Sequence, residues 1–152
     1  MLAITRTDSD HPHFGQLVAR LDAFLADHDG DDHTFYAQFN PTVGLPNVVL
    51  AHWDAQPVAC GAFRLMDGGV VEIKRMFVDE ASRGQGVAAR VLAELESWAV
   101  ELGARRAILE TGVGLLPAVR LYRRSNYQVI ENYPPYVGVD TSVCMGKNLA
   151  ER

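Results

Sequence analysis

One short segment in the middle of the chain combines the residue types that bind a multiply charged anion: Arg83-Gly84-Gln85-Gly86-Val87-Ala88. It lies between an expected strand and a long expected helix. The first backbone N–H groups of a helix have no partner within the helix, and the helix dipole is positive there. Glycine lets a ligand approach the backbone closely, and arginine presents a planar fork that matches phosphate oxygens. The segment therefore predicts a phosphate or diphosphate site at a helix start.

The segment does not match the common nucleotide-binding motifs. A P-loop would need Gly-Lys-Ser/Thr after its glycines, and that ending is absent. The dinucleotide fingerprint G-x-G-x-x-G fails because Ala89 stands where its last glycine would be, and the preceding strands predict a meander instead of a βαβ unit. On composition alone, a plain glycine-rich turn that starts a helix explains the segment equally well.

Hydrophobic periodicity predicts the elements around this segment. Strands are expected at 2–7, 47–53, 57–66, 70–78, 106–111, 127–132 and 142–148, with a hairpin turn at Asp67-Gly68-Gly69. Helices are expected at 87–102 and 116–125, in a first stretch from 8–12 to 27–32, and in a short one at 33–40. The predicted class is α/β, of the α+β kind: a mixed, mostly antiparallel central sheet of roughly six to seven strands with about four helices on both faces.

The bulk composition suits one domain over 1–152. The formal net charge of −5 argues against a nucleic-acid partner, because nonspecific nucleic-acid binders usually carry a basic stripe. No apolar run approaches the roughly 18 residues that a membrane span needs, so no membrane association is expected. The chain start lacks a charged segment followed by an apolar run, so the expected location is cytoplasmic.

Cysteine and metal-type patterns in the chain are weak. Cys60 and Cys144 stand outside any C-x-x-C pair, and we expect two reduced core thiols. The acidic run 27–33 lacks the glycine and glutamate positions of a calcium loop. His11-x-His13 lacks further ligands at metal spacing. The sequence therefore predicts no metal site.

Four separated motifs together resemble one enzyme family. Arg83-x-x-Gly86-x-Ala88 matches the Q/R-x-x-G-x-G/A signature of the GNAT superfamily of N-acetyltransferases. The run EIKRMFV at 72–78 resembles the fourth strand of that family, and LETG at 109–112 resembles its fifth. LYRRSNY at 121–127 resembles the helix-to-strand segment that usually reads LYxxxGF. The agreement of separate motifs in the expected order makes the resemblance specific. Within the family, the chain is similar to small bacterial proteins of poorly known substrate.

The resemblance implies a GNAT fold whose sheet splays between its fourth and fifth strands, with acetyl-CoA as cosubstrate. The pantetheine arm would pair with backbone groups of Met76, Phe77 and Val78, like an added strand. The pyrophosphate would lie on the glycine-rich segment, that is on Arg83, Gly84, Gln85, Gly86, Val87 and Ala88. A backbone N–H near Phe77 would stabilise the oxyanion that develops during acyl transfer.

The implied reaction moves the acetyl group to a primary amine by direct attack in a ternary complex. Glu72 matches a strand-four glutamate that some members use as a base, and Tyr122 matches the tyrosine that protonates the leaving thiolate. Each also has a structural interpretation. Tyr122 fits a packing residue on the apolar side of its helix, and Glu72 fits an exposed residue or an ion pair with Arg64 or Arg75. Glu110 is expected to be a structural hydrogen-bond acceptor.

Aromatic and polar residues outside these motifs indicate where the acceptor would bind. Tyr36 and Asn40 precede the 47–53 strand, where this family forms one wall of the acceptor cleft. Tyr133 and Tyr136 lie in the last hairpin loop, which often forms the other wall. The expected partner is a small-molecule or peptide amine. The same side chains also fit a core or a homodimer contact, and the chain as a whole also fits a non-catalytic acyl-CoA-binding or sensor module.

Two departures from the family pattern have consequences for binding. Leu115 and Leu116 stand where many members carry an Asn or Gln that bonds to CoA, so the glycine-rich segment is expected to carry a larger share of CoA binding. Asn126 replaces the usual glycine of LYxxxGF. Asparagine tolerates the left-handed conformation that ends a helix, so this change is mild.

Overall fold

The computed structural model describes residues 1–29 and 44–149. The chain groups into two compact units, each assembled from separate stretches of sequence. The first unit comprises Met1–Arg64 and Lys74–Leu95, and the second comprises Leu65–Ile73 and Glu96–Arg152. The single domain expected over 1–152 stays a prediction.

The strands form a seven-stranded sheet in the order β1-β2-β3-β4-β5-β7-β6. Their bounds are β1 Leu2–Thr7, β2 Asn47–Trp53, β3 Gln56–Met66, β4 Val70–Val78, β5 Arg106–Gly112, β6 Gln128–Ile130 and β7 Ser142–Asn148. β4 pairs with β5 in parallel, while β1–β2, β2–β3, β5–β7 and β6–β7 are antiparallel. The predicted mixed, mostly antiparallel sheet is therefore confirmed.

The described residues contain three α-helices and one short 3-10 helix. Their bounds are α1 Pro12–Asp29, the 3-10 helix η2 Glu80–Ser82, α3 Val87–Glu101 and α4 Leu116–Arg124. This is slightly fewer than the expected four α-helices. The short helix expected at 33–40 lies outside the described residues. None of the helices in the described part of the chain is long and apolar enough to cross a membrane.

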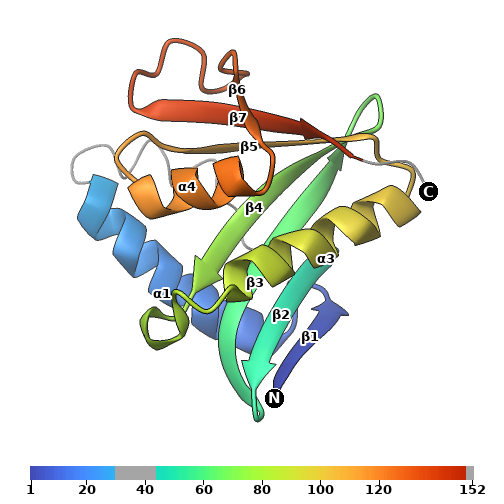
Figure 1. Ribbon diagram of the computed structural model, residues 1–152, viewed down its shortest axis with the longest axis vertical. Coiled ribbons are helices and arrows are strands. Elements are labelled where there is room, and N and C mark those ends of the chain that lie inside the picture. Colours follow the sequence, from blue (N-terminus) through green and yellow to red (C-terminus); the bar gives the residue numbers. More distant parts are fainter. Residues whose placement is uncertain (30–43, 150–152) are drawn as a thin grey trace. The chain divides into compact units, whose positions relative to one another are not determined.

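In the first unit, helices cover both faces of the strands (Figure 1). The apolar stripe of α1 packs on one face in a buried cluster with side chains from β2, β3 and β4: Phe14, Leu17, Val18, Leu21, Val48, Leu50, Cys60, Ala62 and Phe77. Gly61 faces the other way. A β-carbon at Gly61 would lie 2.8 Å from Leu95 Cδ1 and 3.1 Å from Val91 Cγ1, both on α3. The absence of a side chain at Gly61 therefore lets α3 pack directly against β3.

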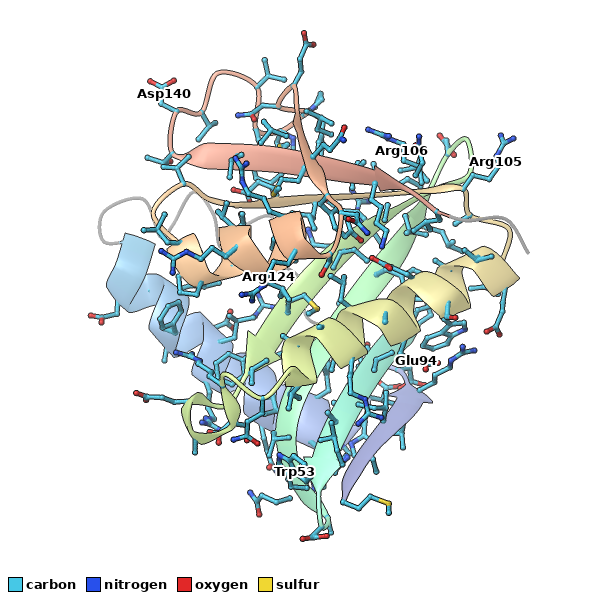
Figure 2. All side chains as sticks on the ribbon, in the orientation of Figure 1. Trp53, Glu94, Arg105, Arg106, Arg124 and Asp140 are labelled. Carbon is cyan, nitrogen blue, oxygen red and sulfur yellow. The ribbon has the colours of Figure 1, made fainter. Side chains whose placement is uncertain are left out.

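An ion pair at the edge of the first unit joins β1 to α3. Arg6 Nε lies 2.6 Å from Glu94 Oε2, and Figure 2 shows Glu94 on α3. Both side chains are partly exposed, so this pair contributes on the order of 0.5 kcal/mol. The buried apolar faces of α1 and α3 are the larger source of stability, because each fully buried large apolar side chain contributes about 1.5–3 kcal/mol.

In the second unit, β7 pairs with β5 along its whole length, from Arg106–Asn148 to Gly112–Ser142. Arg106 Nη1, at the start of β5 in Figure 2, also donates to the Asn148 side-chain oxygen at 2.9 Å. The parallel pairing of β4 with β5 is much shorter and runs only from Val70–Arg106 to Glu72–Ile108. β4 continues to Val78 and β5 continues to Gly112 beyond it. A short ladder of this kind is what the predicted splay between the fourth and fifth strands requires.

Backbone conformations confirm the sequence-based turn assignments. Gly68 and Gly69 both have positive φ, 77° and 76°, as the hairpin turn after Asp67 requires. Asn126 has φ 74°, and the Tyr127 N–H donates to the Tyr122 carbonyl at 2.9 Å, so asparagine ends α4 in the left-handed conformation. The strand expected at 127–132 is shorter than predicted, because β6 pairs with β7 for only three residues, Gln128–Ile130.

Candidate active site

The glycine-rich segment forms an exposed turn directly before α3. Gly84 and Gly86 both have φ of 77°, in the left-handed region that disfavours other residues. Among residues 1–29 and 44–149, and apart from each glycine and its two chain neighbours, no heavy atom lies within 4 Å of the position that a β-carbon would occupy at Gly84 or Gly86. α3 begins at Val87, whose side chain is buried, and its first hydrogen bond runs from Arg90 N to Gly86 O at 3.2 Å. The turn therefore leaves open space beside unpaired N–H groups at a helix start.

The side chains of this turn are anchored within the first unit. Arg83 Nε donates to the Val78 carbonyl at 3.3 Å, and its guanidinium carbon lies 5.9 Å from the centre of the Phe24 ring. The Gln85 amide donates to the Ala81 carbonyl at 3.4 Å. These contacts hold an exposed positive charge near the end of β4 and beside the helix start, which is the arrangement that a diphosphate requires.

The last residues of β4 follow an irregular position in the strand. Arg75 has φ of 59°, which is unusual for a residue other than glycine and interrupts the regular backbone before Met76, Phe77 and Val78. The Arg75 guanidinium is buried and forms an ion pair with Asp22 of α1. The Cys60 thiol donates to the Arg75 carbonyl at 3.4 Å. Arg75 therefore ties β4 to α1, and the pairing of Glu72 with Arg64 or Arg75 stays a prediction.

Glu72 is a buried carboxylate in the second unit. Its side chain is 3% exposed, so the alternative of an exposed surface residue is wrong. The Tyr133 hydroxyl donates to Glu72 Oε2 at 2.8 Å. Burial and the negative charge of Glu72 raise the pKa of the Tyr133 hydroxyl, so this phenol stays protonated and remains the donor. A carboxylate that accepts a charge-assisted hydrogen bond can also accept a proton from a substrate.

Tyr122 lies at the inner side of α4 and is also buried. Its side chain is 7% exposed, and its ring lies 5.9 Å from the ring of Tyr127 in an edge-on arrangement. Burial raises the pKa of the Tyr122 hydroxyl, and the charge of Glu110 raises it further. The phenol therefore keeps its proton over the physiological range and can donate it, although it is a weaker acid than an exposed tyrosine. The packing interpretation of Tyr122 and the catalytic one are both compatible with this burial.

The two cysteines are free and buried, as expected. Burial raises the pKa of the Cys60 thiol to about 12. Burial also raises the pKa of Cys144, which pairs with Glu110 across the β5–β7 ladder. Because the thiolate is the nucleophilic form, a raised pKa leaves both thiols protonated and not activated as nucleophiles.

Three histidines lie together in the first unit, where α1 starts beside β2. His13 Nδ1 and His52 Nε2 are 2.9 Å apart, and the His11 ring centre lies 5.0 Å from that of His13. Within residues 1–29 and 44–149, however, no group of three or more His, Cys, Asp or Glu side chains is arranged to hold a metal ion. Burial is the main cause that lowers the pKa of His52, and the neighbouring His13 and His11 lower it further.

Comparison with protein families identifies the chain. The family model described as the acetyltransferase (GNAT) family matches residues 14–127, which is most of the sequence. The chain belongs to this family. It is therefore an acyl-CoA-dependent N-acetyltransferase that takes acetyl-CoA as its cosubstrate.

Individual relatives of this GNAT protein agree with the family assignment. A protein named IAA acetyltransferase from Azospirillum brasilense is 31% identical over 137 residues, which cover 88% of this chain and 89% of the relative. The uncharacterized N-acetyltransferase YsnE of Bacillus subtilis is 34% identical over 64% of this chain and 66% of its own length. A solved structure of a provisionally named acyl-CoA N-acyltransferase from Klebsiella pneumoniae is also similar to this chain. The two structures superpose with a TM-score of 0.83 at 30% sequence identity, and the match covers 99% of each chain.

The predicted site residues of this GNAT protein divide between the two units. The first unit contains the residues assigned to CoA: Met76, Phe77, Val78, Arg83, Gly84, Gln85, Gly86, Val87 and Ala88. The second unit contains the residues assigned to proton transfer and to one acceptor wall: Glu72, Tyr122, Tyr133 and Tyr136. Tyr36 and Asn40, assigned to the other acceptor wall, lie outside the described residues.

The structure brings some of these residues together and adds others. It joins Glu72 to Tyr133, and it places the ring of Tyr136 5.7 Å from that of Tyr133. The sequence did not indicate the role of Asn132, whose side-chain nitrogen donates to backbone carbonyls of Tyr136, Val139 and Ser142, or that of Arg75. A side chain that bonds to backbone several residues away leaves no periodic signal in the sequence. The two prolines at 134 and 135 indicated only that a loop lies there.

Proposed function

We propose that this GNAT protein moves the acetyl group of acetyl-CoA to the primary amine of a small molecule or peptide by direct attack in a ternary complex. The observation that carries the proposal is the open, left-handed turn at Gly84 and Gly86 before α3, in a chain of this family. The CoA pyrophosphate would lie against this turn, on the free N–H groups of the helix start and the charge of Arg83. The backbone of Met76, Phe77 and Val78 would pair with the pantetheine arm.

In the proposed reaction, the amine nitrogen bonds to the thioester carbon and the bond from that carbon to sulfur breaks. A backbone N–H near Phe77 would stabilise the oxyanion of the tetrahedral intermediate. Glu72, directly or through water, would take the proton of the amine, and Tyr122 would give a proton to the CoA sulfur. The buried and protonated thiols of Cys60 and Cys144 support direct attack over a covalent acyl-enzyme.

The acceptor is proposed as an amine because the proton acceptor within the second unit is a buried carboxylate. An amine with a pKa near 10 arrives protonated, and a carboxylate both attracts the cation and removes its proton. The aromatic rings of Tyr133 and Tyr136 would line the acceptor site. Tyr36 and Asn40 remain the sequence-based candidates for the opposite wall.

The test is a screen for acetyl-CoA consumption against amino acids, polyamines, aminoglycosides and peptides with free N-termini. IAA is included in the panel because the Azospirillum brasilense relative is named an IAA acetyltransferase. We expect release of CoA thiol with at least one amine, together with a product that carries one added acetyl group on nitrogen. Binding of acetyl-CoA without turnover of any acceptor would favour the rival function, a non-catalytic acyl-CoA-binding or sensor module.

A further inference from the structure

The buried pair Glu72–Tyr133 suggests a role for Tyr133 beyond that of an aromatic wall. We propose that Tyr133 is a positioning residue, whose hydroxyl holds the Glu72 carboxylate in one orientation as the proton acceptor. The inference rests on the proposed function, in which Glu72 takes the amine proton.

The geometry of the pair is that of a strong hydrogen bond. The Tyr133 hydroxyl and Glu72 Oε2 are 2.8 Å apart, although the two residues are 61 positions apart in the sequence. Glu72 is only 3% exposed, so water does not compete effectively for its oxygens. A hydrogen bond to a charged group is stronger in a site of low dielectric than in water. The hydrogen bond from the phenol therefore restricts rotation of the carboxylate.

The segment that carries Tyr133 is itself held by specific contacts. The Asn132 side-chain nitrogen lies 3.1 Å from the Tyr136 carbonyl, 3.3 Å from that of Val139 and 3.2 Å from that of Ser142. The Tyr136 N–H donates to the Tyr133 carbonyl at 2.7 Å. The ring of Tyr136, which is buried, packs edge-on against the ring of Tyr133. Tyr133 thus approaches Glu72 from an ordered turn and not from a freely moving side chain.

In this arrangement, the hydroxyl and the ring of Tyr133 have different roles. The hydroxyl of Tyr133 is already engaged with Glu72, so only its ring remains for contact with an acceptor. Titratable groups that interact with this pair include Cys144 on β7, Tyr136 in the loop and Glu110 on β5. Burial and the charge of Glu72 raise the pKa of the Tyr133 hydroxyl, so Glu72 is the member of the pair that can take a proton from the substrate.

The experiment is a pH profile of kcat/KM for Tyr133→Phe, with acetyl-CoA and whichever acceptor the screen identifies. Removal of one hydrogen bond to a carboxylate makes that carboxylate easier to protonate. We expect the acid limb of the profile to move up by about one pH unit and the neutral-pH value to fall by about tenfold. Affinity for CoA, measured by calorimetry, stays at the wild-type value, because the proposed CoA residues are not changed.

Tyr127→Phe is the matched control in the same unit. The Tyr127 hydroxyl donates to Glu96 Oε2 at 2.8 Å, so this variant also removes a phenol from a carboxylate, but from a different one. We expect its acid limb to coincide with that of the wild type. If Tyr133→Phe does not fold, 3-fluorotyrosine at position 133 tests the same idea, since it keeps the shape of the residue. As a stronger donor, it should move the acid limb to lower pH.

Glu72→Gln separates failure of this inference from failure of the proposed function. If Glu72→Gln loses activity while Tyr133→Phe reproduces the wild-type profile, the positioning role is overturned and the function of Glu72 stands. If Glu72→Gln keeps full activity and the acid limb, Glu72 is not the base, and both the base assignment and the positioning role are overturned. A shifted acid limb in Tyr133→Phe together with loss of activity in Glu72→Gln supports both.

Discussion

At the scale of single residues, the second unit contains a buried phenol, Tyr122, and a buried carboxylate, Glu72. Tyr122 is a buried phenol whose pKa is raised by burial and by the charge of Glu110, so it stays protonated. Glu72 is a buried carboxylate that accepts a hydrogen bond from Tyr133. A proton donor and a proton acceptor are what amine acetylation requires, because one proton must leave the nucleophile and one must reach the leaving group.

Tyr122→Phe tests the proposed donor. We expect kcat to fall by about a hundredfold, because general acid catalysis typically contributes at least that much, while the KM for acetyl-CoA changes little. Steady-state kinetics on the purified variant measure both. Tyr127→Phe is again the control, since the ring of Tyr127 packs against Tyr122 but its hydroxyl donates a hydrogen bond to Glu96. Unchanged turnover in Tyr122→Phe would leave Tyr122 as a packing residue.

The buried thiols lead to a kinetic prediction. With Cys60 and Cys144 both protonated, acetyl transfer should not pass through an acyl-enzyme. Initial rates at varied acetyl-CoA and acceptor should therefore give intersecting lines in a double-reciprocal plot. Parallel lines are the signature of a covalent intermediate and would contradict direct attack.

At the scale of elements, the start of α1 is joined to β2 by neighbouring imidazoles. The pKa of His52 is lowered by burial, then by His13 and His11, so the folded protein binds fewer protons there than the unfolded chain does. The stabilising contribution of a neutral His52 is complete above the ordinary histidine pKa of about 6.5. It decreases as the pH falls below that value toward the lowered pKa of the folded state.

His52→Gln tests this linkage. The melting temperature of the wild type should decrease between about pH 6.5 and pH 5, and the decrease should be smaller in the variant, which lacks one titrating group. Thermal unfolding followed by circular dichroism at several pH values measures the difference. Equal pH dependence in the two proteins would show that His52 does not contribute to the acid sensitivity of the fold.

Most element bounds could be predicted from the sequence because strong local signals coincide with them. β2 and β4 agree with the expected ranges, since prolines, glycines and aspartates end these apolar runs. β6 is shorter than expected because its length depends on a partner strand, and no local pattern specifies where that pairing ends. The irregular backbone at Arg75 could not be predicted either, since tertiary contacts with Asp22 and Cys60 support it.

At the scale of the whole molecule, the sequence indicated which residues belong to the candidate site better than it indicated the contacts between them. The glycine-rich segment has a local physical signature, and its conformation agrees with the prediction. The hydrogen bond from Tyr133 to Glu72 joins distant parts of the chain, and no sequence spacing indicates it. The net charge of −5 also gave no sign of the anion site, because a local arrangement of N–H groups and one arginine is enough to form it.

The most direct test of the account is the affinity for CoA of wild type and Gly86→Trp, measured by titration calorimetry. An indole at position 86 would occupy the open space beside the turn, and its β-carbon opposes the left-handed backbone. Gly68→Trp is the control, because Gly68 also has positive φ, 77°, and no atom of the described residues beyond its chain neighbours lies within 4 Å of its β-carbon position. We predict that Gly86→Trp weakens CoA binding by at least about tenfold, or 1.4 kcal/mol, while Gly68→Trp binds CoA with the wild-type affinity. Equal affinity in Gly86→Trp and the wild type would contradict the placement of CoA on this turn.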